Sequence, residues 1–146
     1  MLSDRSIQEI FEGIGGQFLT PANDISKKLK GIKCFVFDWD GVFNNGIKPD
    51  SNGSTFSEPD SMGINLLRFS YWLTHNELPL TAIITGQANE RAIEFAKREH
   101  LSVIYTNSIN KLEVLNQLTK NHDIDSEQVM FTFDDVLDLS VAEVCG

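Results

Sequence analysis

The sequence is organised around one stretch, Phe35-Val36-Phe37-Asp38-Trp39-Asp40-Gly41-Val42. Its apolar part belongs to a run over residues 33–39 that is too short for a helix and rich in Phe and Val, which predicts a buried β-strand. Asp38, Asp40 and Gly41 come at the end of this run. Because Asp and Gly are frequent in turns, the stretch by itself is also compatible with a plain turn after a strand.

From residue 32 onward, short apolar runs alternate with longer amphipathic ones, the pattern of β–α units around a parallel sheet. We therefore predict an α/β fold, a Rossmann-like three-layer sandwich with a central parallel sheet and no large cap domain. The predicted strands cover residues 33–39, 80–84, 103–105 and 129–133, and the predicted helices cover residues 61–76, 89–100, 111–121 and 136–144. Residues 47–57, which we call the flap, surround Ser51-Asn52-Gly53, where Asn-Gly favours a small β-hairpin.

The first 31 residues differ from the rest of the chain. Their apolar residues share one helical face, and glycines and a proline then end that helix early. The apolar residues are Ile7, Ile10, Phe11 and Ile14, and the residues that end the helix are Gly13, Gly15, Gly16 and Pro21. We predict an N-terminal appendage over residues 1–31, made of a short helix and a linker, and a single domain over residues 32–146.

Acidic residues outnumber basic ones, with 21 Asp and Glu against 12 Lys and Arg, for a net charge of -9. Such a surface repels the phosphate backbone of nucleic acids, so we expect no nucleic-acid partner. No apolar run approaches the ~20 residues that cross a bilayer, and no apolar segment of a secretory signal follows the N-terminus. Cys34 and Cys145 lack the spacing of a metal site and fit free thiols of a reducing cytoplasm.

Polar side chains follow each predicted strand, at the edge of a parallel sheet where ligands bind. They are Asp38 and Asp40, Thr85 and Gly86, Asn110 and Lys111, and Asp134 and Asp135. So many carboxylates cannot all stay ionised without a cation. Oxygen ligands without His or Cys select a hard ion, which we predict to be Mg²⁺. Carboxylates, a hydroxyl and an ammonium group together suit nucleophilic attack on a phosphate ester.

Each of these pieces also has a purely structural interpretation. The dipeptide Thr85-Gly86 occurs by chance in many sheets, and Lys111 alone fits a solvated helix residue. Asp134 alone fits a helix cap whose charge the helix dipole favours. Their joint occurrence, in this order and each at a strand end, favours a functional interpretation.

The series of motifs resembles the four motifs of the haloacid dehalogenase superfamily of phosphohydrolases. The motifs are Phe35-Val36-Phe37-Asp38-Trp39-Asp40-Gly41-Val42, Ile83-Ile84-Thr85-Gly86, Asn110-Lys111 and Asp134-Asp135-Val136-Leu137-Asp138. Within the superfamily, the flap, the short chain and the absence of a large cap insertion resemble the branch of 3-deoxy-D-manno-octulosonate 8-phosphate phosphatase.

The resemblance implies a phosphatase, a hydrolase of phosphoric monoesters, that acts on a small phosphorylated metabolite through an aspartyl-phosphate intermediate. One candidate substrate is a sugar-acid phosphate such as 3-deoxy-D-manno-octulosonate 8-phosphate. Asp38 would be the nucleophile, and Asp40 would be the general acid for the leaving alcohol and later the base for water. Thr85, Gly86 and Lys111 would bind the phosphoryl group.

The resemblance also implies how Mg²⁺ is held. Its ligands would be the carboxylates of Asp38 and Asp134 and the backbone carbonyl of Asp40, with Asp135 and Asp138 in support. Asp60 aligns with an Asp of the branch and is therefore assigned to substrate binding. A homotetramer is expected on the same ground, whereas a cytoplasmic location is expected from the N-terminus and the two cysteines.

The chain also departs from the pattern of the branch. It has Pro59 and Gln87 where the branch has Arg, and Phe133 where the branch has Gly. It ends at Gly146, so we expect it to lack the C-terminal strand and tail with which the family fold continues. These departures motivate an alternative function, a catalytically weakened binding or assembly module of the same fold.

Two other classes of protein combine similar residues and are disfavoured, one by the order of its motifs along the chain and the other by the identity of two residues. A signalling receiver domain carries its acidic pair after the first strand, whereas Asp134-Asp135 follows the last one here. A calcium-binding loop that began at Asp38 would need Asp or Asn and then Gly where this chain has Val42 and Phe43.

Overall fold

The computed structural model describes residues 2–146, and the chain divides into two units between Ile32 and Lys33. The N-terminal unit holds two helices, α1 (Asp4–Gly13) and α2 (Ala22–Leu29). The second helix lies where the sequence was expected to form a linker. Its charges explain why that expectation was wrong, because Asp24 in the first turn and Lys27 in the last turn complement the helix dipole.

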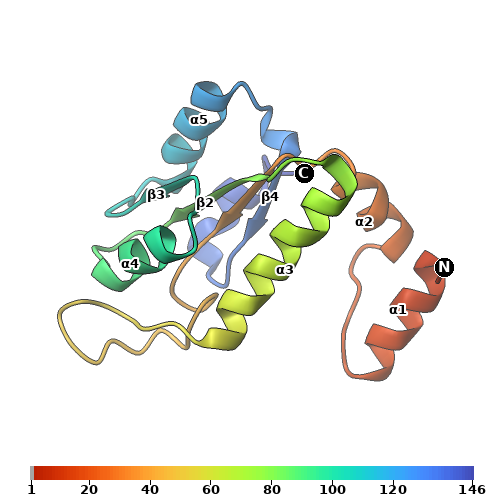
Figure 1. Ribbon diagram of the computed structural model, residues 1–146, viewed down its shortest axis with the longest axis horizontal. Coiled ribbons are helices and arrows are strands. Elements are labelled where there is room, and N and C mark those ends of the chain that lie inside the picture. The colour runs from red at the N-terminus through yellow and green to blue at the C-terminus, as the bar shows by residue number, and fades with distance from the viewer. Residues whose placement is uncertain (1) are drawn as a thin grey trace. The chain divides into compact units, whose positions relative to one another are not determined.

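The C-terminal unit is built on a parallel sheet of four strands in the order β3-β2-β1-β4. The strands are β1 (Cys34–Phe37), β2 (Leu80–Ile84), β3 (Val103–Tyr105) and β4 (Val129–Thr132). Val36 in the central strand β1 lies opposite Ala82 on one side and Phe131 on the other. The chain therefore builds outward from β1 to β3 and then returns to the other side of β1 (Figure 1).

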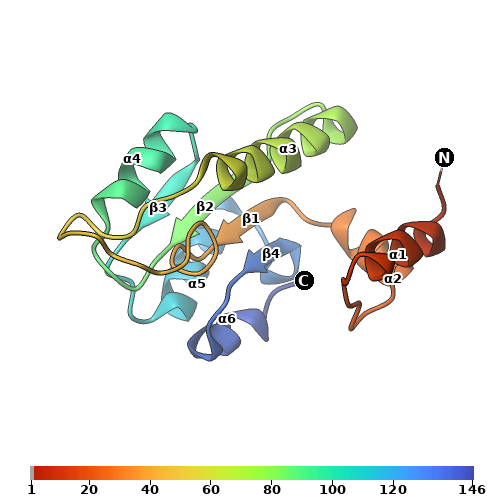
Figure 2. The ribbon, with the colours of Figure 1, turned by 90° about the horizontal axis from the view of Figure 1, so that it is seen from below.

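Helices cover both faces of the sheet. They are α3 (Glu58–His75), α4 (Glu90–Arg98), α5 (Lys111–His122) and the short α6 (Leu139–Ala142), with 3-10 turns η1 (Ser126–Gln128) and η2 (Val136–Asp138). In Figure 2, α3 and α4 lie on one side of the strands and α5 and α6 on the other. The predicted three-layer α/β sandwich is thus confirmed. No helix within residues 2–146 is both long enough and apolar enough to cross a membrane.

Successive side chains of β1 supply both halves of the core. Cys34 and Val36 are fully buried in a cluster with Leu115 of α5 and Val141 of α6. Phe35 points to the other face, where its ring packs edge-on against Tyr71 of α3 at a centroid distance of 5.8 Å. A parallel strand buried on both faces is continuously apolar, which explains why the run ending at Asp38 carries no polar alternation.

A cluster of four aromatic rings joins the end of β1 to the flap and to α4. The Trp39 ring stacks on Phe43 at 5.0 Å, and Phe43 lies 5.0 Å from Phe95 of α4. Phe56 in the flap lies 4.9 Å from the same Phe95 ring. Phe95 therefore contacts rings from two segments that are distant from it in sequence, the end of β1 and the flap.

The flap differs from the predicted hairpin. Within the described residues it contains no strand and only one antiparallel bridge, between Asp50 and Gly53. One backbone hydrogen bond, from the Gly53 amide to the Asp50 carbonyl at 3.4 Å, lies within the flap, and two flap carbonyls bond to the start of α4. The carbonyl of Asn52 accepts the Glu90 amide at 3.1 Å, and the carbonyl of Gly53 accepts the Arg91 guanidinium.

Two helix boundaries also differ from the predicted ones. Helix α3 begins at Glu58, three residues before the predicted start at residue 61, because Ser57 caps it and Pro59 suits a first turn. The predicted helix over residues 136–144 is a 3-10 turn followed by the four-residue α6. The Asp135 side chain accepts the Leu137 amide at 3.0 Å and so favours the tight turn.

Replacing Phe95 by Ala tests the aromatic cluster. We expect the free energy of unfolding, measured by urea denaturation, to fall by about 3–5 kcal/mol, because a fully buried ring is lost and a cavity remains. The matched control is Glu94→Ala, an exposed neighbour on α4, for which a change within about 0.5 kcal/mol is expected. Equal effects of the two substitutions would contradict this account of the core.

Candidate active site

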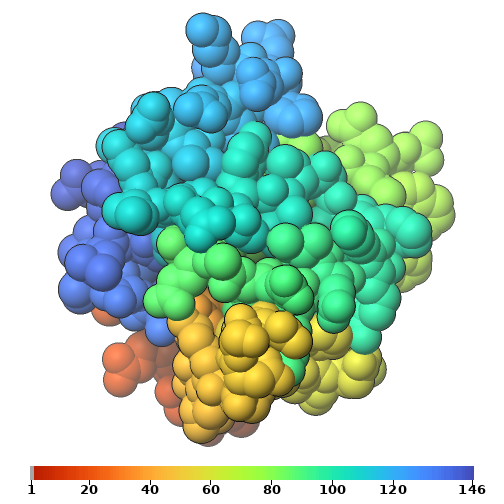
Figure 3. All heavy atoms as spheres, turned by 90° about the vertical axis from the view of Figure 1, so that its left-hand side faces the viewer, coloured from red at the N-terminus to blue at the C-terminus, as the bar shows by residue number. Residues whose placement is uncertain are grey.

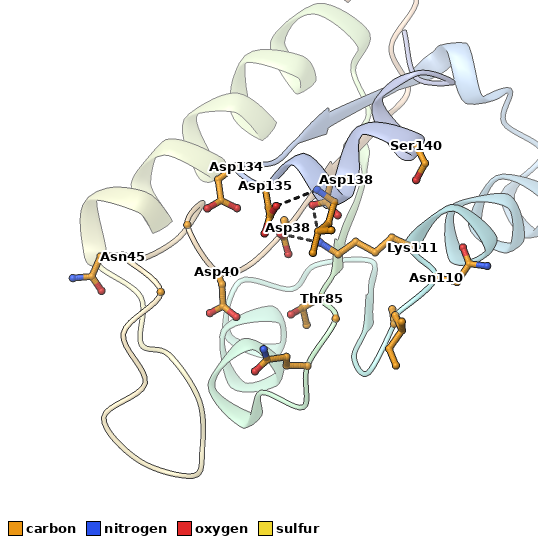
Figure 4. A pocket seen from close by; sticks show the side chains of 17 residues that line it. Asp38, Asp40, Asn45, Thr85, Asn110, Lys111, Asp134, Asp135, Asp138 and Ser140 are labelled. Carbon is orange, nitrogen blue, oxygen red and sulfur yellow. Dashed lines mark hydrogen bonds and ion pairs between the residues drawn. The ribbon is translucent and has the colours of Figure 1, made fainter.

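Residues that follow all four strands converge on a single cavity. Its volume is about 440 Å³, and it lies at the carboxyl edge of the sheet, beside the point where the strand order reverses between β1 and β4. Five carboxylates and one lysine line it: Asp38, Asp40, Asp134, Asp135, Asp138 and Lys111. Thr85, Gly86, Gln87 and Ser108 complete the part of the wall formed by the turns after β2 and β3. Figure 4 shows these side chains gathered around the end of β1.

Asp38 is the first residue after β1 and is buried, with 6% of its surface exposed. Its Oδ1 accepts the Trp39 amide at 2.6 Å, and its Oδ2 lies 2.8 Å from the Lys111 Nζ. Burial raises the pKa of the Asp38 carboxyl, although Lys111 and the Trp39 amide oppose this effect. The charge of Asp38 is therefore only partly compensated by the protein.

Lys111 begins α5 and reaches the site between two carboxylates. Besides Asp38, its Nζ donates to Asp138 Oδ2 at 2.7 Å. Asp138 ends η2 and is buried. Burial by itself lowers the pKa of the Lys111 ammonium, but the hydrogen bonds to Asp138 and Asp38 outweigh burial and raise it. Lys111 is thus a fixed positive charge beside Asp38.

Asp40 is held by the flap. Its Oδ1 accepts a hydrogen bond from the Ser54 hydroxyl. The Ser54 oxygen in turn accepts Trp39 Nε1 at 2.9 Å and Asn89 Nδ2 at 3.0 Å. Because the hydroxyl donates once and accepts twice, its hydrogen-bonding capacity is filled and the carboxylate of Asp40 is fixed.

Lys48, also in the flap, approaches the other oxygen of Asp40. Its Nζ lies 3.5 Å from Asp40 Oδ2 and donates to the side-chain oxygen of Gln87. Figure 3 faces this side of the C-terminal unit, with the flap in yellow and orange directly below the green turn that follows β2. The flap therefore brings a second cation to the rim of the cavity.

Asp134 is exposed and has a different environment from Asp38. No hydrogen bond or ion pair to the Asp134 carboxylate is found among residues 2–146. Its carboxylate lies against Gly41, where a side chain would leave a Cβ only 1.8 Å from Asp134 Oδ2. Gly41 also has φ +77°, which favours glycine. The approach of Asp134 to the chain after β1 thus requires glycine at this position.

The donor set fits a hard divalent cation. Asp38 and Asp134 offer carboxylate oxygens, and a cation would compensate the charge of the buried Asp38. Within residues 2–146, no three side chains of His, Cys, Asp or Glu are clustered closely enough to hold a metal ion by themselves. A bound cation therefore needs further oxygens from the main chain or from water, as Mg²⁺ commonly does.

Of the two remaining predicted residues, Thr85 lines the cavity and Asp60 does not. Thr85 is buried at the end of β2, and its carbonyl accepts the Ser108 amide at 3.0 Å, which holds the turn around the cavity. Asp60 accepts a hydrogen bond from the Ser57 hydroxyl at the start of α3. The structure therefore brings the predicted residues together with the exception of Asp60.

Comparison with known proteins places this geometry in a family. No protein-family model matches the chain. The structure of 3-deoxy-D-manno-octulosonate 8-phosphate phosphatase from Moraxella catarrhalis, in complex with magnesium, phosphate and KDO, matches with a TM-score of 0.72 at 30% identity, over 85% of this chain and 70% of that one. The chain belongs to the haloacid dehalogenase superfamily. It is a phosphatase of the branch that its motifs resemble.

Other solved structures agree with this assignment. A protein from Pseudomonas syringae named as a probable YrbI family phosphatase matches with a TM-score of 0.72 at 31% identity, over 84% of this chain and 68% of that one. The 3-deoxy-D-manno-octulosonate 8-phosphate phosphatase from Yersinia pestis matches with a TM-score of 0.72 at 25% identity, over 85% of this chain and 65% of that one.

Sequence reasoning missed two residues of this phosphatase's site, Lys48 and Ser54. A signal for Lys48 was available, because it is the only basic residue between Lys33 and Arg68 and it falls in the flap. Ser54 carries no such signal. It is one of several small polar residues in the flap, and only the folded chain places it beside Asp40.

Replacing Gly41 by Ala tests the position of Asp134 in this phosphatase. The added Cβ must displace the Asp134 carboxylate, so we expect the affinity for Mg²⁺, measured by calorimetry, to fall about tenfold or more, as when a group that orients a ligand is removed. The matched control is Gly46→Ala, because Gly46 has φ +74° but no atom within 4 Å of the added Cβ. If both variants lose the same affinity, backbone strain and not Asp134 is responsible.

Proposed function

We propose that this phosphatase hydrolyses a small phosphate monoester with Mg²⁺, through an aspartyl-phosphate formed on Asp38. The observation that carries the proposal is the position of Asp38, buried on the cavity wall with its Oδ2 2.8 Å from the Lys111 Nζ. A carboxylate removed from water and paired with a fixed cation is a suitable nucleophile for a phosphorus atom whose oxygens share that cation.

In the first step, a carboxylate oxygen of Asp38 bonds to phosphorus while the ester bond from phosphorus to the leaving oxygen breaks. Lys111 and the hydroxyl of Thr85 lie on the cavity wall, where they are available to bind the phosphoryl oxygens. Asp138 holds Lys111 at 2.7 Å and so positions it for this contact. The result is a phosphorylated Asp38 and a leaving group that requires a proton.

Asp40 supplies that proton and later takes one back. In its acid form it protonates the leaving alcohol. As a carboxylate it then accepts a proton from the water that attacks phosphorus, which releases phosphate and restores Asp38. The hydrogen bond from Ser54 and the contact with Lys48 fix where the Asp40 carboxylate lies between these two steps.

The metal would be held by the carboxylates of Asp38 and Asp134 and the backbone carbonyl of Asp40, with Asp135 and Asp138 in support. Mg²⁺ bound there would neutralise the negative charge of the phosphoryl group. Two facts support this choice of ion: the oxygen-only donors of the site and the magnesium in the Moraxella catarrhalis structure.

For the substrate we propose a sugar-acid phosphate such as 3-deoxy-D-manno-octulosonate 8-phosphate. The supporting facts are the names of the relatives and the KDO in the Moraxella catarrhalis structure. Asp60 keeps a proposed role in substrate binding only if the substrate extends beyond the main cavity, since Asp60 lines a neighbouring one with Gly41 and Asn45. The homotetramer is proposed on family resemblance alone, and light scattering would test it.

The alternative of a catalytically weakened module has less support. Pro59 lies in the first turn of α3, where proline is favoured, and does not line the cavity. The Phe133 ring stacks on Phe131 at 5.3 Å and also does not line the cavity. Gln87 alone touches the site, and there it binds Lys48. None of the three departures removes a group that the proposed mechanism uses.

The decisive experiment is Asp38→Asn with 4-nitrophenyl phosphate and Mg²⁺. We expect hydrolysis to fall by about 10⁴-fold, to background, because an amide does not replace the nucleophile. Chelation of divalent cations should abolish wild-type activity, and added Mg²⁺ should restore it.

The matched control is Asp123→Asn, the same change at an exposed residue that ends α5 with φ 54°, a conformation that Asn also tolerates. It should retain wild-type activity. Hydrolysis that survives in Asp38→Asn would exclude the mechanism.

A further inference from the structure

In the mechanism above, Lys48 serves only to position the Asp40 carboxylate, yet its ammonium is bound by two groups of the cavity wall. Its Nζ donates to Gln87 and lies 3.5 Å from Asp40 Oδ2, and both of these residues line the cavity. About a third of the Lys48 side chain is exposed, and although Lys48 does not itself line the cavity, both of its partners do. Lys48 is therefore a cation at the rim of the site.

Lys111, the other cation of the site, is not available to a leaving group. Lys111 Nζ is bound to Asp38 at 2.8 Å and to Asp138 at 2.7 Å. It lies beside the nucleophile, which is where the phosphoryl group is transferred. Lys48 lies instead beside Asp40, which must contact the leaving oxygen to protonate it. In the proposed mechanism the two lysines would thus stand at opposite ends of the ester bond that breaks.

The charge of the cavity makes this difference important. Its wall carries five carboxylates and Lys111. A negatively charged group on the substrate, in addition to the phosphate, would therefore be repelled unless a cation bound it. At the phosphoryl end the proposed metal serves this purpose. At the leaving-group end, Lys48 is the cation that the flap supplies.

The flap holds Lys48 firmly in this place. Beyond it in the chain, Arg91 of α4 binds the carboxylate of Asp50 and the carbonyl of Gly53. Ser54 is hydrogen-bonded to Trp39 and Asn89. An ammonium anchored within a few residues of such contacts loses less conformational freedom on binding, which favours affinity for an anion.

We propose that Lys48 is the residue with which the enzyme recognises a negatively charged group, such as a carboxylate, on the leaving group of its substrate. The substrate's anionic group replaces the Gln87 oxygen as the partner of the Lys48 ammonium, and Gln87 becomes free to donate its amide N–H groups to the same anion. This inference rests on the proposed function, because it takes Asp40 as the group beside the leaving oxygen.

The test uses two phosphate monoesters that compete with 4-nitrophenyl phosphate, and so inhibit its hydrolysis, and that differ in one terminal group. D-glycerate 3-phosphate carries a carboxylate where glycerol 3-phosphate carries a neutral hydroxymethyl group. We expect the wild-type enzyme to bind the glycerate compound about tenfold more tightly, as a charged hydrogen bond allows. In Lys48→Met this ratio of inhibition constants should fall to about one, and Lys48→Arg should restore most of it.

The ratio separates recognition from a structural role of Lys48. If Lys48 only holds the flap against Asp40, Lys48→Met weakens both inhibitors alike and the ratio does not change, which overturns the inference. A wild-type ratio near one overturns it as well. Failure of the wild-type enzyme to hydrolyse 4-nitrophenyl phosphate would instead count against the proposed function, on which the inference depends.

Discussion

Two buried carboxylates share the ammonium group of Lys111, and the geometry of the site depends on this shared contact. Asp38 follows β1, Lys111 begins α5 and Asp138 ends η2, so the contact joins three parts of the fold. A buried charge without a partner costs several kcal/mol, on the order of 3–5 when one partner of a pair is removed. The sheet order, with β1 beside β4, is what makes this arrangement possible.

A second constraint fixes the opposite side of the cavity. Ser54 links Asp40 to Trp39 and Asn89, and the aromatic ring of Phe56 packs against Phe95. The flap therefore combines a satisfied polar contact with a buried apolar one within three residues. This combination holds Asp40 for proton transfer and places Lys48 at the rim without the strand pairing that a hairpin would need.

Much of the fold was predictable because its signals are local. The apolar runs of β2 and β3 end abruptly at polar residues, and both strands have the predicted bounds. The predictions were wrong where local signals compete. The turn expected at Ser51-Asn52-Gly53 forms, with one antiparallel bridge, but no strands extend from it, because the carbonyls of Asn52 and Gly53 accept donors of α4. In the site, Asp38, Thr85, Lys111 and Asp134 line one cavity, as expected from strand ends, whereas Asp60 does not. Their catalytic roles stay predictions.

The sequence by itself determined the parallel α/β sandwich, the acidic motif after the first strand and the superfamily. The reason is that the spacing of apolar residues and the short motifs are properties of residues close together in the chain. Only the tertiary structure decided that Lys48 meets Gln87, 39 residues away, and that Ser54 meets Asp40, 14 residues away. Such contacts depend on which strands are neighbours and on the path of the flap between them. That path depends on which hydrogen-bond partners the flap finds elsewhere in the C-terminal unit, and no local sequence pattern predicts them.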